Sequence, residues 1–541
     1  MTPRTARAVP LEPRANGNPG RRLVKTRTAA SPRGAATLPE AAGPNAAIIA
    51  VVVGYFLVLV GIGWWASRES RSVKGFYVAG KKLPSWVIAF SSNTTGESGW
   101  LLLGLTGMGY LVGFHALWVV LGEVLGVALA WAVVARPFKE FTDRYDAITV
   151  PDYLTDRFAD RLNIIRIVSA VIIFTMVGAY TAAQLTATGK AFSSFIGTSY
   201  EAGVYIGLAV ILLYTSIGGF KAVAYSDVLQ GVLMFLCLLI LPIVGIWHAG
   251  GWGEMLAGIG EADPALLRPM GEHGLTVTGV MSAISYVGIG LAFLGAPQLL
   301  TRFMSARNRG QISRGGVLAV VCIVVFDIGA VLTGVAGRYL FPGLADPETV
   351  LPVMSTELFP AVIAGVILVV VLAAIMSTVD SLLILASSSI VRDVMQKIFR
   401  PDFSDWGLAM IGRGLTVVLG LAGLGVALSE PRMIFWFVLF AWSGLASAFT
   451  PVVLCSLFWR RTTLAGAVWG MIAGFAAAML WVVFVKDHFY DLYEMIPGFA
   501  AGFAVTIGVS LYTDPPPDGG SIVDDVKRVV GGPFSVGEGD R

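Results

Sequence analysis

The residues best suited to chemistry in this chain form a polar run, SSNTTGESG, at positions 91–99. The run interrupts an apolar segment of membrane length, LPSWVIAFSSNTTGESGWLLLGLTG, at positions 83–107. A lipid-facing helix would not hold it, because unsatisfied backbone and a carboxylate are both costly in hydrocarbon. We therefore predict that the middle of the segment is unwound and lines a polar cavity, as in the midplane binding sites of secondary transporters.

A second interrupted segment, SYVGIGLAFLGAPQLLTRFM, covers positions 285–304. Pro297 removes a backbone hydrogen bond and clashes with the preceding turn, and Gly288, Gly290 and Gly295 precede it. Taken alone, the segment is typical of a proline-kinked helix. It lies five predicted spans after the first segment, however, which is the spacing of an inverted repeat. We therefore favour a pair of discontinuous helices.

Composition indicates a polytopic membrane protein. The chain has 541 residues, of which 56% are hydrophobic and 13% are charged, whereas soluble domains carry about 25% charged residues. Three scattered cysteines indicate buried thiols rather than a disulfide framework or a metal site. The sequence holds no P-loop, GxSxG or HExxH motif. We expect a protein that is not an enzyme, and neither a nucleic-acid partner nor an obligate protein partner is indicated.

Hydropathy predicts about thirteen spans, each near the ~20 residues that a bilayer requires. They lie near 46–66, 84–111, 114–135, 162–192, 201–220, 227–247, 276–302, 315–341, 357–390, 407–428, 433–458, 463–485 and 495–513. The polar residues 1–45 are predicted to form a disordered basic tail, and residues 514–541 a C-terminal tail.

The charge of the predicted loops indicates the orientation. Twenty-two Lys and Arg residues fall in one set of loops and five in the opposite set, so the first set is predicted to be cytoplasmic. Thirteen spans then place the C-terminus inside and the N-terminus outside the plasma (inner) membrane. The arginine-rich N-terminal tail conflicts with this placement. An exception for the tail, a true start further downstream or an even number of spans would each remove the conflict.

Four further stretches of sequence carry recognisable motifs in a fixed order: ITVPDYLTDRF (148–158), YTSIGGFKAVAYSDVLQG (214–231), GAPQLLTRFM (295–304) and LAAIMSTVDSLL (372–383). Together with SSNTTGESGWLLLGLTG they resemble the sodium:solute symporter family, most of all its bacterial sodium/proline symporters, from about residue 46 to 513. The resemblance implies an all-α, LeuT-like fold. In that fold two inverted five-helix repeats, here roughly 84–247 and 276–458, begin with discontinuous helices and transport by alternating access.

The resemblance also implies a sodium ion between the first break and the eighth repeat helix. Its implied ligands are three main-chain carbonyls and two hydroxyls, those of Thr94, Glu97, Ala374, Ser377 and Thr378. The physics agrees, since Na⁺ is a hard cation and unwound backbone supplies oxygen ligands without a full extra charge. The Ser-Thr pair alone would be weak support, because such hydroxyls often bond back to their own helix.

One departure from the family concerns the acid at the first break. The proline symporters carry an aspartate where this chain has Gly96, and here the acid is one position later, at Glu97. A shift of one residue rotates a helical side chain by about 100°, so Glu97 does not simply inherit the aspartate's role. Glu97 either gives the cavity negative potential or accepts a proton, or it caps backbone N–H groups or pairs with a local cation.

A candidate second cation or release site consists of Asp227, Asp380 and Ser381. By resemblance, two acids and hydroxyls there could hold a second Na⁺, or one acid could stay protonated. The alternatives are an internal ion pair with a nearby Arg, or Asp227 as a helix N-cap. Glu123 and Asp327 are also intramembrane acids, but no motif assigns them a role.

The solute pocket is predicted to lie beside the two breaks. Ser98, Gly99 and Trp100 match solute-proximal residues of the proline symporters. Tyr180 and Gln184 are polar at mid-depth in the third repeat helix, where they either face the cavity or bond a neighbouring helix.

The second broken helix departs from the proline symporters beside Pro297, which is retained. Those proteins place a Trp and a Tyr before the Pro, whereas this chain has Ile289 and Phe293. The pocket loses an indole N–H and a hydroxyl, so its specificity can differ from proline. Phe293 is interpreted either as an apolar wall of the pocket or as helix packing.

From these features we expect a Na⁺-driven symporter for a small zwitterionic or carboxylate solute such as proline, working within membrane lipid. A solute carboxylate could dock at a half-helix N-terminus, where the helix dipole favours negative charge. The alternatives are H⁺ coupling through Glu97, Asp227 or Asp380, another organic acid or zwitterion as solute, and a sensor without net transport. A sensor would usually need an attached signalling domain.

Overall fold

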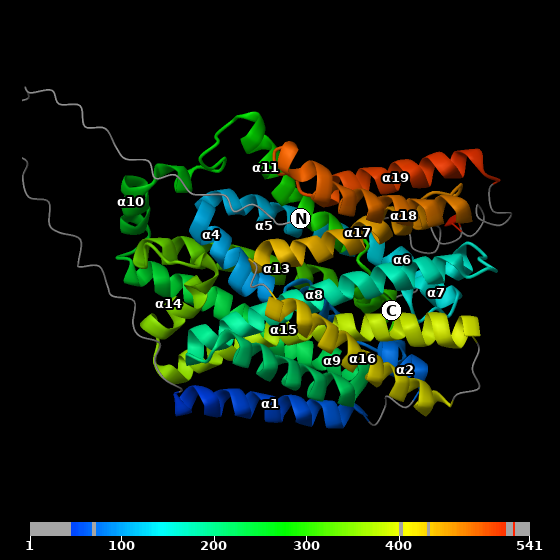
Figure 1. Cartoon of the computed structure of the whole chain (residues 1–541), viewed down its shortest axis with the longest axis horizontal. Helices are drawn as coiled ribbons and strands as arrows, with labels where there is room; N and C mark the ends of the chain where they lie inside the picture. Colours follow the sequence, from blue (N-terminus) through cyan, green and yellow to red (C-terminus); the bar gives the residue numbers. More distant parts are fainter. Residues whose placement is uncertain (1–44, 68–71, 400–403, 430–432, 515–522, 525–541) are drawn as a thin grey trace, which may run out of the picture. The chain divides into compact units, whose positions relative to one another are not determined.

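The computed structural model describes residues 45–67, 72–399, 404–429, 433–514 and 523–524 (Figure 1). Within this part of the chain the regular elements are all helices, and the only β-like contact is one bridge between Leu83 and Ala306. An apolar chain folds this way in lipid because each backbone N–H and C=O must find a partner within its own segment. The predicted all-α fold is confirmed. The predicted tails at 1–45 and 514–541 lie almost entirely outside the described residues.

Eleven of the described helices are long and apolar enough to cross a membrane. The prediction was about thirteen spans, and two of these are not counted separately in the structure. The span at 84–111 is divided, so its first part is short and its second part runs on into the next span. The span at 201–220 corresponds to a shorter apolar helix, Tyr200–Leu212, which precedes a kink at Gly219.

The long helices of the bundle are α1 (Ala46–Ser67), α8 (Ile164–Ile196), α9 (Tyr200–His248), α13 (Arg309–Leu340), α15 (Ala361–Ser388), α16 (Asp405–Ser429), α17 (Ile434–Phe458), α18 (Leu464–Leu480) and α19 (Met495–Tyr512). Shorter helices flank or connect them: α2 (Val73–Val78), α5 (Leu117–Leu129), α6 (Ala135–Arg144), α7 (Val150–Arg157), α10 (Trp252–Ala262) and α14 (Val350–Leu358).

The first predicted interruption is present. Helix α3 (Ser85–Gly96) ends where Glu97 turns to extended backbone, with φ −95° and ψ 112°. A widened helical turn follows at Trp100–Leu105, and α4 (Thr106–Val112) completes the segment. The polar residues before Gly96 are therefore helical, and the helix is broken over the last residues of the run.

The second predicted interruption is present as well. Helix α11 (Val277–Gly288) tightens into a 3₁₀ turn at Ile289–Leu294, and α12 (Pro297–Met304) then begins at the proline. Pro297 suits that first helical position because its φ is fixed and its missing N–H would have no helical partner there.

The two broken helices are joined near the ends that face away from the breaks. Leu83, just before α3, donates its N–H to the Ser305 carbonyl at 3.1 Å, just after α12. Its own carbonyl accepts from the Arg307 N–H at 3.0 Å. These bonds hold the first half of one broken helix to the second half of the other.

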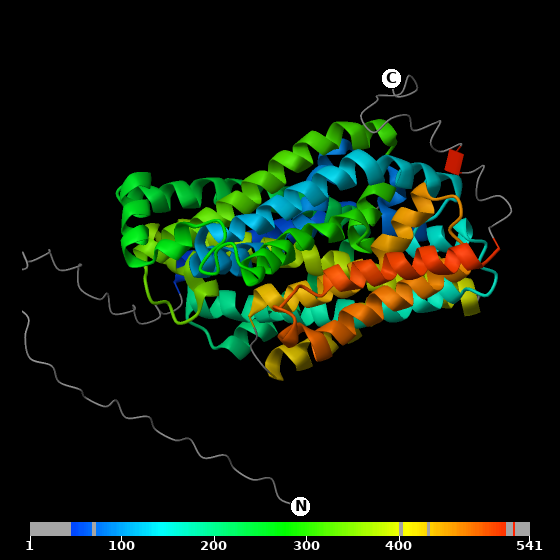
Figure 2. The same cartoon turned by 90° about the horizontal axis from the view of Figure 1, so that it is seen from above.

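Helix α15 lies inside the bundle, between α1 at one edge and α19 at the other (Figure 1). It packs against α3, α8 and α9. In its most apolar window 83% of residues are buried inside the protein, against 28% in α1. Helices α18 and α19 run side by side at the periphery in both views (Figure 2). A helix that is mostly buried inside the protein thus faces the first break.

Candidate cation and solute site

The first break and the middle of α15 are joined by short hydrogen bonds. The Ser377 hydroxyl lies 2.8 Å from the Thr94 carbonyl and 2.9 Å from the Ala374 carbonyl, and its single proton is shared between these two acceptors. The neighbouring Thr378 hydroxyl donates to the Thr95 carbonyl at 3.2 Å. All of these residues are fully buried. Several oxygen atoms therefore converge where a hard cation would find its ligands.

Four of the five predicted sodium ligands are placed by these contacts. Thr94, Ala374 and Ser377 meet directly, and Thr378 lies beside them. Glu97 leaves helical geometry, as a main-chain ligand at a break requires, and its N–H closes α3 by donating to the Asn93 carbonyl at 2.8 Å. The Glu97 carbonyl stays a predicted ligand.

The predicted second cation site contains an arginine. Arg302 of α12 places its Nη2 3.4 Å from an Asp227 oxygen of α9. The same nitrogen donates to the hydroxyls of Ser381 and, at 2.6 Å, Thr95. The Ser91 hydroxyl donates to Asp227 at 2.6 Å. This arrangement is the internal ion pair that was the alternative interpretation, and a protein cation already lies where a second Na⁺ was predicted.

Arg302 is one of the 22 Lys and Arg residues that the sequence analysis counted in the predicted cytoplasmic loops, and for this residue the assignment was wrong. The residue lies in α12 with 1% of its surface exposed, and its guanidinium also lies 5.0 Å from the centre of the Phe220 ring. Its position in the run TRFM, one turn after Pro297, was the available signal. A buried Arg needs a nearby carboxylate, and Asp227 supplies it.

The predicted solute residues at the first break contact helix α8. The Gln184 amide donates to the Ser98 hydroxyl at 3.1 Å, and its oxygen accepts from the Gly99 N–H at 3.2 Å. A Cβ at Gly99 would lie 2.8 Å from the Ala187 methyl, so glycine is what permits this approach. Gln184 thus faces the break and holds a backbone donor there.

The predicted aromatic residues gather around one residue that the sequence reasoning missed, Trp442 of α17. Its ring lies 5.6 Å from Phe293 and 6.4 Å from Tyr180, both edge-to-face. Its indole N–H points at the Ile289 carbonyl, at 3.4 Å. Trp100 instead stacks on Phe435 at 5.5 Å. A tryptophan in the middle of an apolar span was the only sequence signal for Trp442.

Several buried polar atoms around the two breaks have no hydrogen-bond partner among the described residues. They include the Trp100 indole N–H, both amide atoms of Gln298 and the Thr450 hydroxyl. Gln298 directly follows Pro297, and Thr450 contacts the backbone at Gly295 so closely that a Cβ there would lie 2.5 Å from the Thr450 Cα. Since buried polar groups are normally satisfied, these atoms are available to a bound solute.

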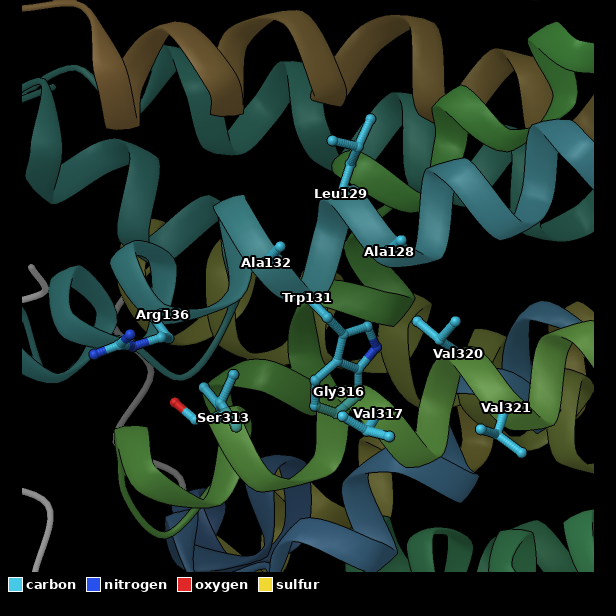
Figure 3. Close-up of a pocket in the computed structure, with 11 residues that line it drawn as sticks. Ala128, Leu129, Trp131, Ala132, Arg136, Ser313, Gly316, Val317, Val320 and Val321 are labelled. Carbon is cyan, nitrogen blue, oxygen red and sulfur yellow. The ribbon is translucent and has the colours of Figure 1, made fainter. Parts of the chain in front are cut away.

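A separate cavity of about 490 Å³ lies between the α5–α6 connection and α13 (Figure 3). Trp131, Val317 and Val321 give it an apolar lining, and Arg136 and Ser313 lie at one end. Val317 is 74% exposed. An open apolar groove on a membrane-length helix suits lipid rather than the solute.

Comparison with known proteins identifies the family of the chain. The model of the "Sodium:solute symporter family" matches residues 76–474. The high-affinity proline transporter PutP of Bacillus subtilis is 35% identical over 460 residues, covering 84% of this chain and 96% of that protein. A sodium/proline symporter of Staphylococcus aureus is 32% identical over 496 residues, covering 88% and 95%.

Among solved structures, a Na⁺-coupled sialic acid symporter in a substrate-bound outward-open state has a TM-score of 0.74 at 18% identity, covering 87% of this chain and 99% of that one. This likeness shows the fold. The chain is a polytopic membrane protein with two discontinuous helices. It belongs to the sodium:solute symporter family.

Proposed function

We propose that this protein couples the inward movement of Na⁺ to the uptake of proline or a closely related amino acid. The observation that carries the proposal is the junction of α3 and α15, where the Ser377 hydroxyl lies 2.8 Å from the Thr94 carbonyl. The names of the relatives, which are proline transporters and sodium/proline symporters, support proline as the solute.

The ion acts by joining the two halves of the fold. An ion at this junction is held by α3, which belongs to the first proposed repeat (84–247), and by α15, which belongs to the second (276–458). Its binding therefore favours the arrangement in which the repeats are correctly placed for the solute, and its loss to a low-sodium cytoplasm releases them. The proposed location is the plasma (inner) membrane, with the C-terminus inside and the N-terminus outside.

The solute is proposed to bind between the break of α3, Gln184 and the aromatic residues around Trp442. The Gly99 N–H, which now bonds the Gln184 oxygen at 3.2 Å, is a donor for a solute carboxylate. Phe293 and Trp442 give an apolar wall that suits a pyrrolidine ring. This chain has Ile289 where the proline symporters have a tryptophan, so Trp442 of α17 supplies the tryptophan of the pocket instead.

Lipid chains fill the groove of Figure 3.

A thermal-shift experiment on the purified full chain tests this proposal. A ligand that binds only the folded state at about 100 times its Kd stabilises by about 2.7 kcal/mol. Proline is expected to raise the melting temperature in NaCl but much less in KCl, and an amino acid such as lysine serves as the control. An equal proline response in both salts would contradict Na⁺ coupling, and no response to proline in NaCl would contradict the solute.

A further inference from the structure

Three buried carboxylates from three different helices meet beside the first break. Glu97 directly follows α3, Glu123 lies in α5 and Asp327 lies in α13. One carboxylate oxygen from each lies within 4.8 Å of the other two. Their exposed fractions are 0%, 2% and 0%. Sequence reasoning recognised all three as intramembrane acids but gave no reason to group them.

Close packing of backbone fixes the positions of these side chains. Next to Glu123, a Cβ at Gly122 would lie 2.4 Å from the Val287 carbonyl, so α5 and α11 cross without intervening side chains. Two turns after Asp327, a Cβ at Gly334 would lie 2.1 Å from the Thr106 carbonyl, which brings α13 against α4. Such approaches through small residues are how membrane helices pack, and here they leave the acids little room to separate.

The second observation concerns the hydrogen bonding of these acids. Apart from hydrogen bonds that the three acids can share among themselves, both oxygens of Glu97, both of Asp327 and Oε2 of Glu123 are buried without a hydrogen-bond partner in the part of the chain that the structure describes. No Lys or Arg of that part forms an ion pair with any of the three. Buried carboxylates in native proteins are normally paired, hydrogen-bonded or bound to a cation. The Glu97 side chain is fully buried and has no partner outside the cluster in the described part of the chain, which points to a ligand shared with the other two.

The cluster lies on a different side of α3 from the proposed sodium site. Asn93, one turn before Glu97, bonds the Ala319 carbonyl of α13 at 2.6 Å. Thr94, one residue later, contacts Ser377 of α15. The first contact is made by a side chain and the second by a main-chain carbonyl, and they reach two different helices, α13 and α15. The acids therefore form a separate group of oxygens on the α13 side of the break.

We propose that Glu97, Glu123 and Asp327 form a second Na⁺ site. The inference rests on the proposed function only in taking Na⁺ as the coupling ion. The three carboxyl groups present only oxygen, which hard cations prefer, and their spacing lets one ion contact all three. Because one Na⁺ balances a single negative charge in this buried site, two of the three carboxyl groups carry protons when the ion is bound. The ion at Ser377 joins α3 to α15, and the ion at the carboxylates joins the end of the same helix to α5 and α13. Two ions thus hold the broken helix from two sides.

The test uses the purified full chain in proteoliposomes, with initial rates of proline uptake measured against Na⁺ concentration. The wild type is expected to show a Hill coefficient approaching two, since a Hill coefficient is limited by the number of coupled sites. Asp327→Asn and Glu123→Gln are expected to lower it to about one and to lower the charge moved per proline from about two to about one. Glu254→Gln, an exposed acid of α10, is the matched control. Unchanged Hill coefficients and charge ratios in both variants would overturn the proposal.

A second measurement tests the second Na⁺ site separately from the proposed function. It uses two alternative variants of the carboxylates, so that poor folding of one of them does not prevent the test. Ser377→Ala weakens the first site, so Na⁺ stabilisation that survives in it is assigned to the carboxylates. We expect Na⁺, but not K⁺ or Ca²⁺, to raise the melting temperature of Ser377→Ala, and adding Glu123→Gln or Asp327→Asn to abolish the rise. A rise that persists in both double variants, or one caused by K⁺ or Ca²⁺ rather than Na⁺, would overturn the second site. Failure of Na⁺-driven proline uptake in the wild type would instead overturn the proposed function.

Discussion

The hydroxyl of Ser377 and the main-chain carbonyl of Thr94 lie 2.8 Å apart across the interface of α3 and α15, although the two residues are 283 positions apart in sequence. Because Thr94 is in the last turn of α3 before the break, this bond links the first helix of one repeat to the middle of the other. Replacing the hydroxyl removes one oxygen ligand and leaves the carbonyls in place.

Ser377→Ala is therefore expected to lower the apparent Na⁺ affinity of uptake by about tenfold, equivalent to about 1.4 kcal/mol. The measurement is the Na⁺ concentration that gives half-maximal proline uptake. Ser388→Ala, a change near the far end of α15, is the matched control. Equal Na⁺ affinity in Ser377→Ala and wild type would remove this hydroxyl from the site.

Gln184→Ala is expected to alter solute binding more than ion binding. Gln184 bonds the Ser98 hydroxyl and the Gly99 N–H, so its loss frees a donor and a hydroxyl at the break. We expect the KM for proline to change by about tenfold, within the range of a buried hydrogen bond. The Na⁺ dependence measured at saturating proline should stay within about twofold. An unchanged KM for proline would place Gln184 outside the solute site.

Gly96 and Phe293 form a steric pair. A Cβ at Gly96 would lie 2.8 Å from the Phe293 ring, so Gly96→Ala forces the ring to move and costs about 1–3 kcal/mol. Uptake and melting temperature are expected to fall in Gly96→Ala and to recover in Gly96→Ala with Phe293→Leu. Phe293→Leu alone provides the baseline. If the double variant is no better than Gly96→Ala, the ring is not the obstacle.

The pair of Arg302 and Asp227 is expected to behave as one unit. Removing either partner leaves a buried charge, which costs about 3–5 kcal/mol, whereas an apolar pair of similar volume is often neutral. Arg302→Met and Asp227→Leu should each lower the thermal stability in detergent, and the double variant should recover most of it. Additive losses in the double-mutant cycle would contradict direct pairing.

Asp152 lies outside the membrane-length helices, and its contacts with Arg166 and Arg392 are expected to weaken in acid. Its burial raises the pKa of the carboxyl, but the charges of Arg392, at 3.2 Å, and Arg166, at 2.6 Å, outweigh this and leave the pKa below its usual value. Since the pKa of Asp152 is lower in the folded state, the contact contributes its full stabilisation of the fold at pH values above the unfolded-state pKa of about 3.9. The stabilisation is lost as pH falls through the lower folded value.

Asp152→Asn is accordingly expected to lower the melting temperature at neutral pH. It should also flatten the fall in melting temperature between about pH 5 and pH 2 relative to wild type. Asp263→Asn, in a loop on another part of the chain, is the control. Parallel acid limbs in Asp152→Asn and wild type would show that the carboxylate contributes no acid-dependent stability.

The two breaks were predictable because polar residues, Gly and Pro inside membrane-length apolar runs conflict with a continuous helix. The meeting of Ser377 with Thr94 was predicted only through family resemblance, since the two residues lie on separate helices. The pairing of Arg302 with Asp227 was not assigned, because hydropathy places an Arg at the end of an apolar run in a loop. Glu123 and Asp327 illustrate the same limit. Each was visible as an intramembrane acid, but only the packing of α5 and α13 brings them to Glu97.

The central claim is tested most directly by proline uptake into proteoliposomes under imposed ion gradients. An inward Na⁺ gradient at equal pH on both sides is expected to drive transient accumulation of proline above its external concentration. The same gradient should drive little accumulation by Ser377→Ala at low Na⁺. An inward proton gradient in sodium-free medium should drive none. Accumulation driven by the proton gradient alone, with no response to Na⁺, would contradict the account.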